Sequence, residues 1–181
     1  MSARVFLAAG HEFGGGAAAN GLRENPYNAV VGALAVIGLR ERGIEAELAP
    51  LSRRGYPNDI HAKVRWVNER AADRDLAIDI HLDIGDPGCA AFTIDRELDR
   101  TAGNTLALAI AERTGLACRG GRPESETAPG RLGFLHSTRC RALLVELCSM
   151  NSADAEFAQR PWAPLAFAEG LRDGCARVLG R

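Results

Sequence analysis

The sequence lacks the features that would place a protein in a membrane or on a nucleic acid. No apolar run approaches the length of a membrane-spanning helix. The formal net charge is -1 at pH 7, and the chain has only two tryptophans and two tyrosines. It therefore has neither a basic surface nor an aromatic platform on which bases would stack. We predict no membrane span and no nucleic-acid partner.

Cysteine is too sparse and too scattered to form a structural framework. The five cysteines are odd in number, and none belongs to a C-x-x-C motif. Neither a disulfide framework nor a cysteine-type structural zinc site is therefore predicted, and we expect reduced, mostly buried thiols. The N-terminus also lacks the basic and apolar segments of a signal peptide, so we expect synthesis in the cytoplasm.

The order of apolar patterns along the chain predicts an α/β protein. At 181 residues, with 46% hydrophobic and 25% charged residues, the chain suits one soluble domain with its own core. Strands and helices alternate with short links, which is typical of a mostly parallel sheet covered by helices on both faces. We expect about six strands in a mixed, mostly parallel sheet. The predicted strands are 5–8, 45–48, 76–81, 89–94, 132–136 and 142–147, and the predicted helices are about 26–42, 60–72, 97–114 and a last helix after Pro164.

One long segment has no predicted secondary structure. Residues 115–131 are rich in glycine, arginine, proline and polar side chains, and we expect a long exposed loop there. Loops of this length in a compact domain are often functional.

Two histidines follow buried strands in the same way. His11 ends the run Leu7-Ala-Ala-Gly and precedes the glycines at 14–16, and His81 ends Ile78-Asp-Ile. Open α/β sheets bind their ligands at the carboxyl ends of strands. A third polar group, Glu24, lies just before the first helix. Two imidazoles and one carboxylate suffice to hold a catalytic zinc with a fourth position left for water, so we predict one Zn²⁺ per chain at His11, Glu24 and His81.

A further carboxylate lies at the end of an apolar strand. Glu146 follows Ala142-Leu-Leu-Val, where a buried charge is costly unless it has a partner or a task. Next to a metal-bound water it would be a natural general base. His61, in contrast, opens a helix in a polar context and is expected at the surface. Cys140 and Cys148 lie near Glu146, but their apolar neighbours favour burial over a catalytic thiol.

These residues resemble the motifs of the type 3 family of zinc-dependent N-acetylmuramoyl-L-alanine amidases, the cell-wall lytic amidases of bacteria and phages. The resemblance covers almost the whole chain in the same order. The matching segments are Ala8-Ala-Gly-His-Glu-Phe-Gly-Gly-Gly16, Glu24-Asn25, Arg42-Gly-Ile-Glu-Ala46, Lys63-Val-Arg-Trp-Val-Asn68, Asp79-Ile-His-Leu-Asp83 and Leu144-Val-Glu-Leu-Cys-Ser-Met-Asn-Ser152.

The resemblance implies hydrolysis of the amide between N-acetylmuramic acid and L-alanine in peptidoglycan, with Glu146 as catalytic acid and base. It implies that residues 1–181 form one catalytic domain without a separate cell-wall-binding domain. An enzyme of this kind acts on the cell wall, after release of the phage-lysin type or from outside the cell. His136 lies where many members carry a basic residue near the substrate, and Arg122 and Arg131 flank the long loop. These three are predicted, weakly, to contact substrate.

The sequence departs from the family pattern at several positions. Ala8 stands where the family has an aspartate ahead of the first histidine, and Asp83 stands where it usually has asparagine. Glu12 replaces a glycine and either points away or competes with Glu24 for the metal. Two other functions remain open at this point, a zinc carboxypeptidase-like amidohydrolase acting on small peptides and a non-catalytic peptidoglycan-binding module. The oligomeric state is not predicted.

Overall fold

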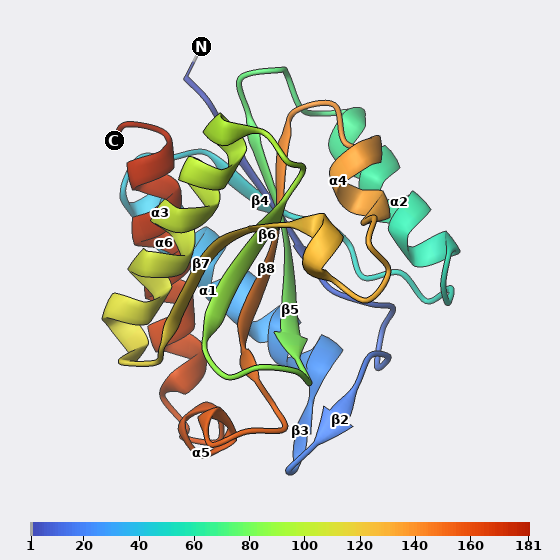
Figure 1. Cartoon of the computed structure of the whole chain (residues 1–181). Coiled ribbons are helices and arrows are strands. Elements are labelled where there is room, and N and C mark those ends of the chain that lie inside the picture. The colour runs from blue at the N-terminus through green and yellow to red at the C-terminus, as the bar shows by residue number, and fades with distance from the viewer. Residues whose placement is uncertain (1) are drawn as a thin grey trace.

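A six-stranded sheet in the order β4-β1-β5-β8-β6-β7 divides the molecule into two helical layers (Figure 1). This computed structural model describes residues 2–181. The sheet is parallel except where β6 meets β8 in antiparallel pairing. Its strands are β1 (Val5–Ala9), β4 (Ala46–Leu48), β5 (Leu76–Asp83), β6 (Cys89–Thr93), β7 (Cys118–Pro123) and β8 (Arg141–Ser149). A separate hairpin pairs β2 (Ala18–Ala19) with β3 (Leu22–Arg23).

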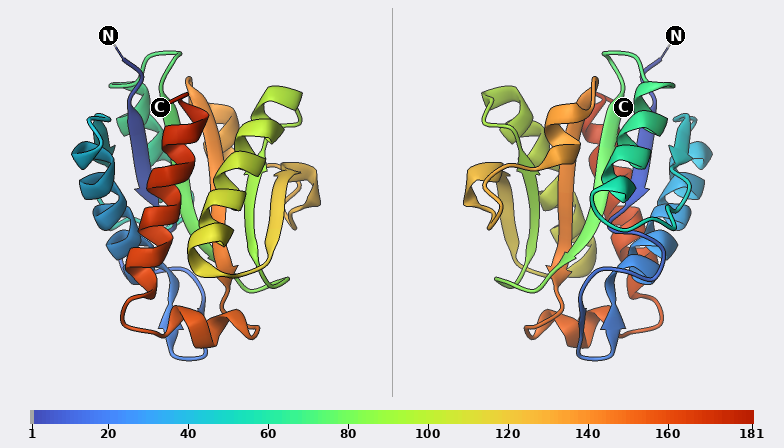
Figure 2. Two further views of the ribbon diagram at one scale, coloured as in Figure 1. Left: turned by 90° about the vertical axis from the view of Figure 1, so that its left-hand side faces the viewer. Right: turned by 90° about the vertical axis from the view of Figure 1, so that its right-hand side faces the viewer.

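Helices cover both faces of the sheet, as the alternating pattern predicts (Figure 2). One layer holds α1 (Glu24–Glu41), α3 (Glu97–Thr114) and α6 (Ala163–Val178), and the other holds α2 (Asn58–Asn68) and the short α4 (Gly133–Ser137). The 3₁₀ turn η1 (Glu124–Glu126) follows β7, and α5 (Asp154–Ala158) follows β8. None of the helices in residues 2–181 combines the length and the apolar character needed to cross a bilayer.

The central strands are apolar along their whole length because both of their faces are covered. All five residues of β1 are buried, and β5 and β8 are buried at most positions. This continuous burial is typical of parallel strands between two helical layers. Because β1, β5 and β8 run parallel, their carboxyl ends lie at one edge of the sheet. There His11 follows β1, and His81 and Glu146 lie within the last residues of β5 and β8.

Two sequence predictions about the second half of the chain are wrong. Leu132–His136, predicted as a strand, includes most of helix α4, because this segment packs against α2 and β8 instead of pairing in the sheet. Residues 115–131 are not a continuous loop, since they contain strand β7 and the turn η1. Strand β7 has two glycines and no apolar alternation, so its hydrophobic periodicity does not indicate a strand. Gly121 passes so close to α3 that an added Cβ would lie 2.3 Å from the Arg100 carbonyl oxygen.

Smaller differences concern the bounds of two helices. Helix α1 begins at Glu24, not after it, and α2 ends at Asn68 instead of Ala72. Four of the five cysteines are buried as predicted, and Cys118 is exposed.

The contact between α3 and α6 supplies a test of the packing. A Cβ added at Gly170 of α6 would lie 2.6 Å from the Cα of Ile110, a backbone atom that cannot move aside. We expect Gly170→Ala to lower the free energy of unfolding by about 2 kcal/mol through overpacking, measured by denaturant titration. Gly38→Ala on α1 is the matched control. It meets only side-chain carbons of Arg172, the nearest being Cδ at 3.0 Å, and should leave stability unchanged or raise it by up to about 1 kcal/mol. Equal losses in the two variants would contradict this account.

Candidate active site

The loop after β1 is held in an unusual backbone conformation. His11 has a φ of 63°, in the left-handed region that non-glycine residues seldom adopt. The buried side chain of Asn25 fixes this loop from the start of α1. Its Nδ2 donates to the carbonyl oxygens of Gly10 (2.8 Å) and His11 (3.2 Å), and its Oδ1 accepts from the Gly14 N–H (3.0 Å). The strained backbone is thus retained by specific bonds, as is common at functional sites.

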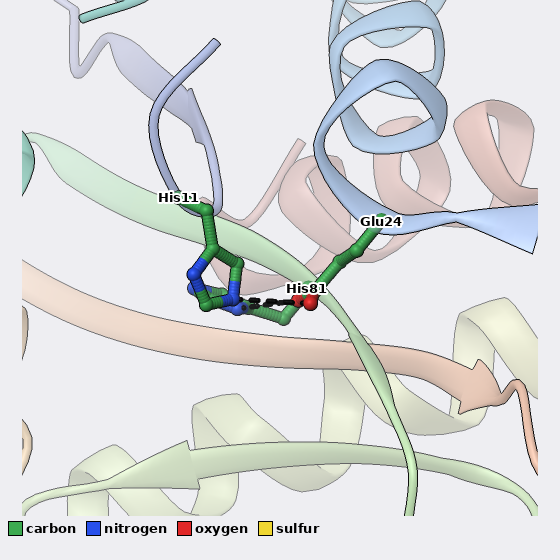
Figure 3. A group of neighbouring side chains, drawn as sticks. All are labelled: His11, Glu24 and His81. Carbon is green, nitrogen blue, oxygen red and sulfur yellow. Dashed lines mark hydrogen bonds and ion pairs between the residues drawn. The ribbon is translucent and has the colours of Figure 1, made fainter. Parts of the chain in front are cut away.

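Glu24, the first residue of α1, extends toward both His11 and His81 and contacts each of them (Figure 3). Its Oε2 is 3.0 Å from Nε2 of His11, and its Oε1 is 2.9 Å from Nδ1 of His81. The N–H groups of Ala17 and Leu82 also donate to this carboxylate. Glu24 is only 3% exposed, so these four contacts replace the water that burial removes.

The three side chains form a cluster of the size and chemistry that a metal ion needs. One donor atom from each of His11, Glu24 and His81 lies within 4.8 Å of the others. Across residues 2–181 no other such group of histidine, cysteine or acidic side chains occurs. Two imidazoles with one carboxylate match the donor set of catalytic zinc sites and leave a coordination position open.

Glycines make room for this cluster. A Cβ at Gly10 would lie 2.5 Å from Cε1 of His81, and a Cβ at Gly16 would lie 2.7 Å from Oε2 of Glu24. Gly16 also has a φ of 84°, which other residues rarely adopt. The backbone is therefore shaped around the three side chains, which fits a metal site.

The electrostatics of the cluster favour a bound cation. Burial acts to raise the pKa of Glu24, but hydrogen bonds and charge from His11 and His81 outweigh it and hold that pKa below its usual range. Burial acts to lower the pKa of His81, but Asp79 and Glu24 outweigh it and raise the pKa well above its usual value. Carboxylates that stabilise a proton on an imidazole stabilise a metal ion at the same place.

Glu146 lies beside this cluster on the next strand. It pairs in register with His81 across β5 and β8, so the two side chains project from the same face of the sheet. Its Oε2 is buried and has no hydrogen-bond partner among the described residues. Burial is the largest of the causes that raise the pKa of Glu146 to about 8, and Asp83 and Glu24 add to it. A carboxyl group with such a pKa can both accept and return a proton near neutral pH.

A cavity of about 620 Å³ connects these groups. It is bordered by His11, His81 and Glu146, and by Asp83 together with Arg119, whose Nη1 donates to Asp83 over 2.8 Å. The remaining wall is largely apolar and comes from α2, β6, β8, α4 and the segment before α4, including Ile60, Phe92, Leu132, Phe134 and Leu144. A water-excluding wall next to charged groups strengthens their interactions with a bound substrate.

The family of the chain follows from a comparison with known proteins. A model of the family described as N-acetylmuramoyl-L-alanine amidase (Amidase_3) matches residues 5–176. The chain belongs to this amidase family. A comparison with curated protein sequences found no match.

Solved structures of amidases share the fold at low sequence identity. The catalytic domain of CwlV from Bacillus (Paenibacillus) polymyxa var. colistinus has a TM-score of 0.80 at 18% identity, over 98% of each chain. AmiC2 of Nostoc punctiforme has a TM-score of 0.82 at 18% identity, over 99% of this chain and 98% of that one. The catalytic domain of an endolysin targeting Clostridia difficile has a TM-score of 0.75 at 18% identity, over 97% of both.

The structure does not bring every predicted residue to the cavity. His136 contacts Glu124 through Nε2, and Arg122 pairs with Glu126. Neither of them nor the exposed Arg131 is among the residues that line the cavity. Their part in substrate binding stays a prediction. Glu12 is outside the metal-binding group, and its carboxylate lies over Gly15. His61 is exposed, as expected.

Sequence reasoning did not identify three buried polar residues at this amidase site. In the sequence Asn25 stands out only as part of the Glu24-Asn25 motif, yet its side chain fastens the His11 loop. Lys63 and Asp79 are 2% and 3% exposed and border the cavity. The spacing of Lys63 and Asp79 along their elements does indicate that both side chains lie on buried faces. Lys63 lies four residues before the buried Val67, and Asp79 lies two residues before His81, which places it on the same face of β5.

Substitution of Gly10 tests the close fit of the cluster. We expect Gly10→Ala to push the His81 ring out of place and to weaken zinc binding at least 10-fold, measured by competition with a chromophoric chelator. Gly133→Ala is the control at the cavity wall, because its nearest neighbour would be 3.6 Å away, an ordinary contact. The assignment fails if Gly10→Ala binds zinc as tightly as the unaltered protein.

The raised pKa of Glu146 predicts a pH-dependent cost in the metal-free protein. A carboxyl group with a pKa of about 8 when folded and about 4.5 when unfolded stabilises the fold below pH 4.5. That stability is lost as the pH rises toward 8. We therefore expect metal-free Glu146→Gln to match the unaltered protein near pH 4.5 and to be about 2 kcal/mol more stable at pH 9. Solvent screening in the cavity keeps this stability difference below the full ~1.4 kcal/mol per unit of pKa shift. Urea titrations at both pH values measure it, and identical curves at pH 9 would disprove the shift.

Proposed function

We propose that the chain is a zinc-dependent amidase that hydrolyses the bond between N-acetylmuramic acid and L-alanine in peptidoglycan. The observation that carries this proposal is the group of His11, Glu24 and His81 with Glu146 in register beside it. These are the four residues that the sequence singles out, and the family match supports the substrate class.

His11, Glu24 and His81 would hold one zinc ion. When bound, zinc supplies Lewis acidity at the scissile carbonyl and lowers the pKa of water to about 7. Glu146 accepts a proton from the attacking water as its oxygen bonds to the carbonyl carbon. It then delivers that proton to the alanine nitrogen as the carbon–nitrogen bond breaks. The products are the lactyl carboxylic acid of the glycan and a stem peptide with a free amino terminus.

The surroundings of these residues support the same chemistry. Burial raises the pKa of Glu146 in the metal-free protein, so its carboxyl group can hold a proton within the cavity. Arg119 and Asp83 at the cavity edge add polar groups next to Glu146. The cavity is not lined by His136, Arg122 or Arg131. Only parts of a long substrate that extend beyond the scissile bond would therefore contact these three residues.

The proposal extends to the setting in which the enzyme works. Residues 1–181 would act as a catalytic domain on the cell wall, in the manner of an endolysin or an extracellular amidase. The fold it shares with the catalytic domain of an endolysin is consistent with this setting.

Digestion of purified sacculi tests the reaction. We expect release of stem peptides with N-terminal L-alanine and of peptide-free glycan, identified by product mass, and loss of both products when a chelator removes zinc. Glu146→Ala should lower the rate at least 10³-fold while still binding one zinc per chain, because the base is removed and the ligands are kept.

Glu112→Gln is the matched control, since Glu112 pairs with Arg177 in the layer on the opposite face of the sheet. It should keep full activity. Full activity in Glu146→Ala would overturn the assigned role. Products cleaved within the stem peptide would identify a peptidase instead, and binding without any cleavage would identify a wall-binding module.

A further inference from the structure

The ring of His81 contacts a carboxylate on each side. Nδ1 lies 2.9 Å from Oε1 of Glu24, within the metal-binding group. Nε2 lies 3.2 Å from Oδ2 of Asp79, which is not a member of that group. The nitrogen on the metal side is therefore Nδ1, and Nε2 is left to donate its hydrogen to Asp79. A ligand histidine bonded in this way has its tautomer and ring orientation fixed.

Asp79 is held in turn by a buried cation. It is 3% exposed, and its second oxygen, Oδ1, has no hydrogen-bond partner within residues 2–181. Nζ of Lys63, on α2, lies 3.7 Å from that oxygen. Lys63 is 2% exposed, and its Nζ likewise lacks a hydrogen-bond partner in the described part of the chain. Although Lys63 borders the cavity, its Nζ is buried, and the nearest carboxylate is that of Asp79.

The identity of this cation is informative. Lys63 is the single lysine among the 22 basic residues of the chain. Every other basic position uses arginine, whose planar fork is larger and carries five donors. A compact point charge with a long apolar stem suits a narrow position between α2 and β5, where a single carboxylate oxygen is the partner.

We propose that Asp79 and Lys63 are positioning residues for the metal site. Asp79 fixes His81 with Nδ1 toward the metal, and Lys63 supplies the charge that keeps Asp79 in place. Metal affinity then depends on two residues that do not touch the metal. This inference rests on the proposed metal site but not on the identity of the substrate.

Zinc affinity, measured by chelator competition, tests the chain of contacts. We expect Asp79→Ala to weaken zinc binding by 10- to 100-fold. Asp79→Asn should lose less, because an amide oxygen still accepts from Nε2. Lys63→Met should weaken binding in the same direction, and the double variant Lys63→Met/Asp79→Ala should be no weaker than Asp79→Ala alone, since both act through one contact.

The control is a second buried aspartate next to the same strand. Asp75 precedes β5 at its other end, is 1% exposed and pairs with Arg4. Asp75→Asn should lower the unfolding temperature but leave zinc affinity unchanged. If Asp75→Asn weakened zinc binding as much as Asp79→Ala does, general destabilisation would explain both results and the proposal would be wrong.

Nitrogen NMR gives a readout that a purely structural role would not change. In the zinc-loaded protein we expect His81 to carry its hydrogen on Nε2. The lone lysine gives one side-chain ammonium signal, which should shift in Asp79→Asn. An unchanged zinc affinity together with an unchanged His81 spectrum in Asp79→Ala would overturn the proposal.

The wild-type protein separates this inference from the proposed function. If it binds zinc through His11, Glu24 and His81 but releases no stem peptide, the amidase assignment fails while the variants still decide the positioning role. If it binds no zinc at these residues, both proposals are overturned.

Discussion

The parallel register of three central strands is the constraint on which the site depends. Ala9 pairs with Ile80, and His81 pairs with Glu146. This register fixes how far β1, β5 and β8 extend relative to one another at the edge of the sheet where they end. A slip of one residue in β8 would turn Glu146 from the face it shares with His81 to the opposite face. The hydrophobic layers prevent that slip, because alternate residues of each strand are committed to separate cores on the two faces. The side chains of the site are thus held in position by the packing of the two hydrophobic cores.

The same layers determine which charges are tolerated. The face that carries Asp79, His81 and Glu146 is covered by α2 and α4, and α4 is only five residues long. The cover is incomplete at the carboxyl edge, and the cavity lies there. A buried carboxylate is costly unless it is paired. Glu24 and Glu146 differ in the number of partners that they have. Glu24 has four partners, whereas Oε2 of Glu146 has none among the residues described. This difference in partners accompanies the opposite pKa shifts of the two carboxyl groups, lowered for Glu24 and raised for Glu146.

The sequence predicts those parts of this structure that repeat a simple pattern. The strands before His11 and His81 are short apolar runs, and the glycines after His11 mark the loop, so these two histidines and the edge of the sheet on which they lie follow from patterns alone. Periodicity places Lys63 and Asp79 on buried faces of their elements, but it does not reveal that they pair, because the partner of a buried charge comes from another element. Strand β7 and helix α4 were missed for a related reason. Their sequences are weak in propensity, and tertiary contacts with α3 and with α2 determine their conformation.

Register also explains one departure from the family pattern. The family has an aspartate at the position of Ala8, and Ala8 pairs with Asp79 on the neighbouring strand. Paired residues of adjacent strands project from the same face, so both positions border the space between β1, β5 and α2. In this chain the carboxylate in that space is that of Asp79, which comes from β5 and contacts His81. The family's aspartate would instead come from β1, the strand that precedes His11. A carboxylate thus still lies near the predicted metal site, but it contacts the second histidine, and the cation beside it is Lys63 of α2.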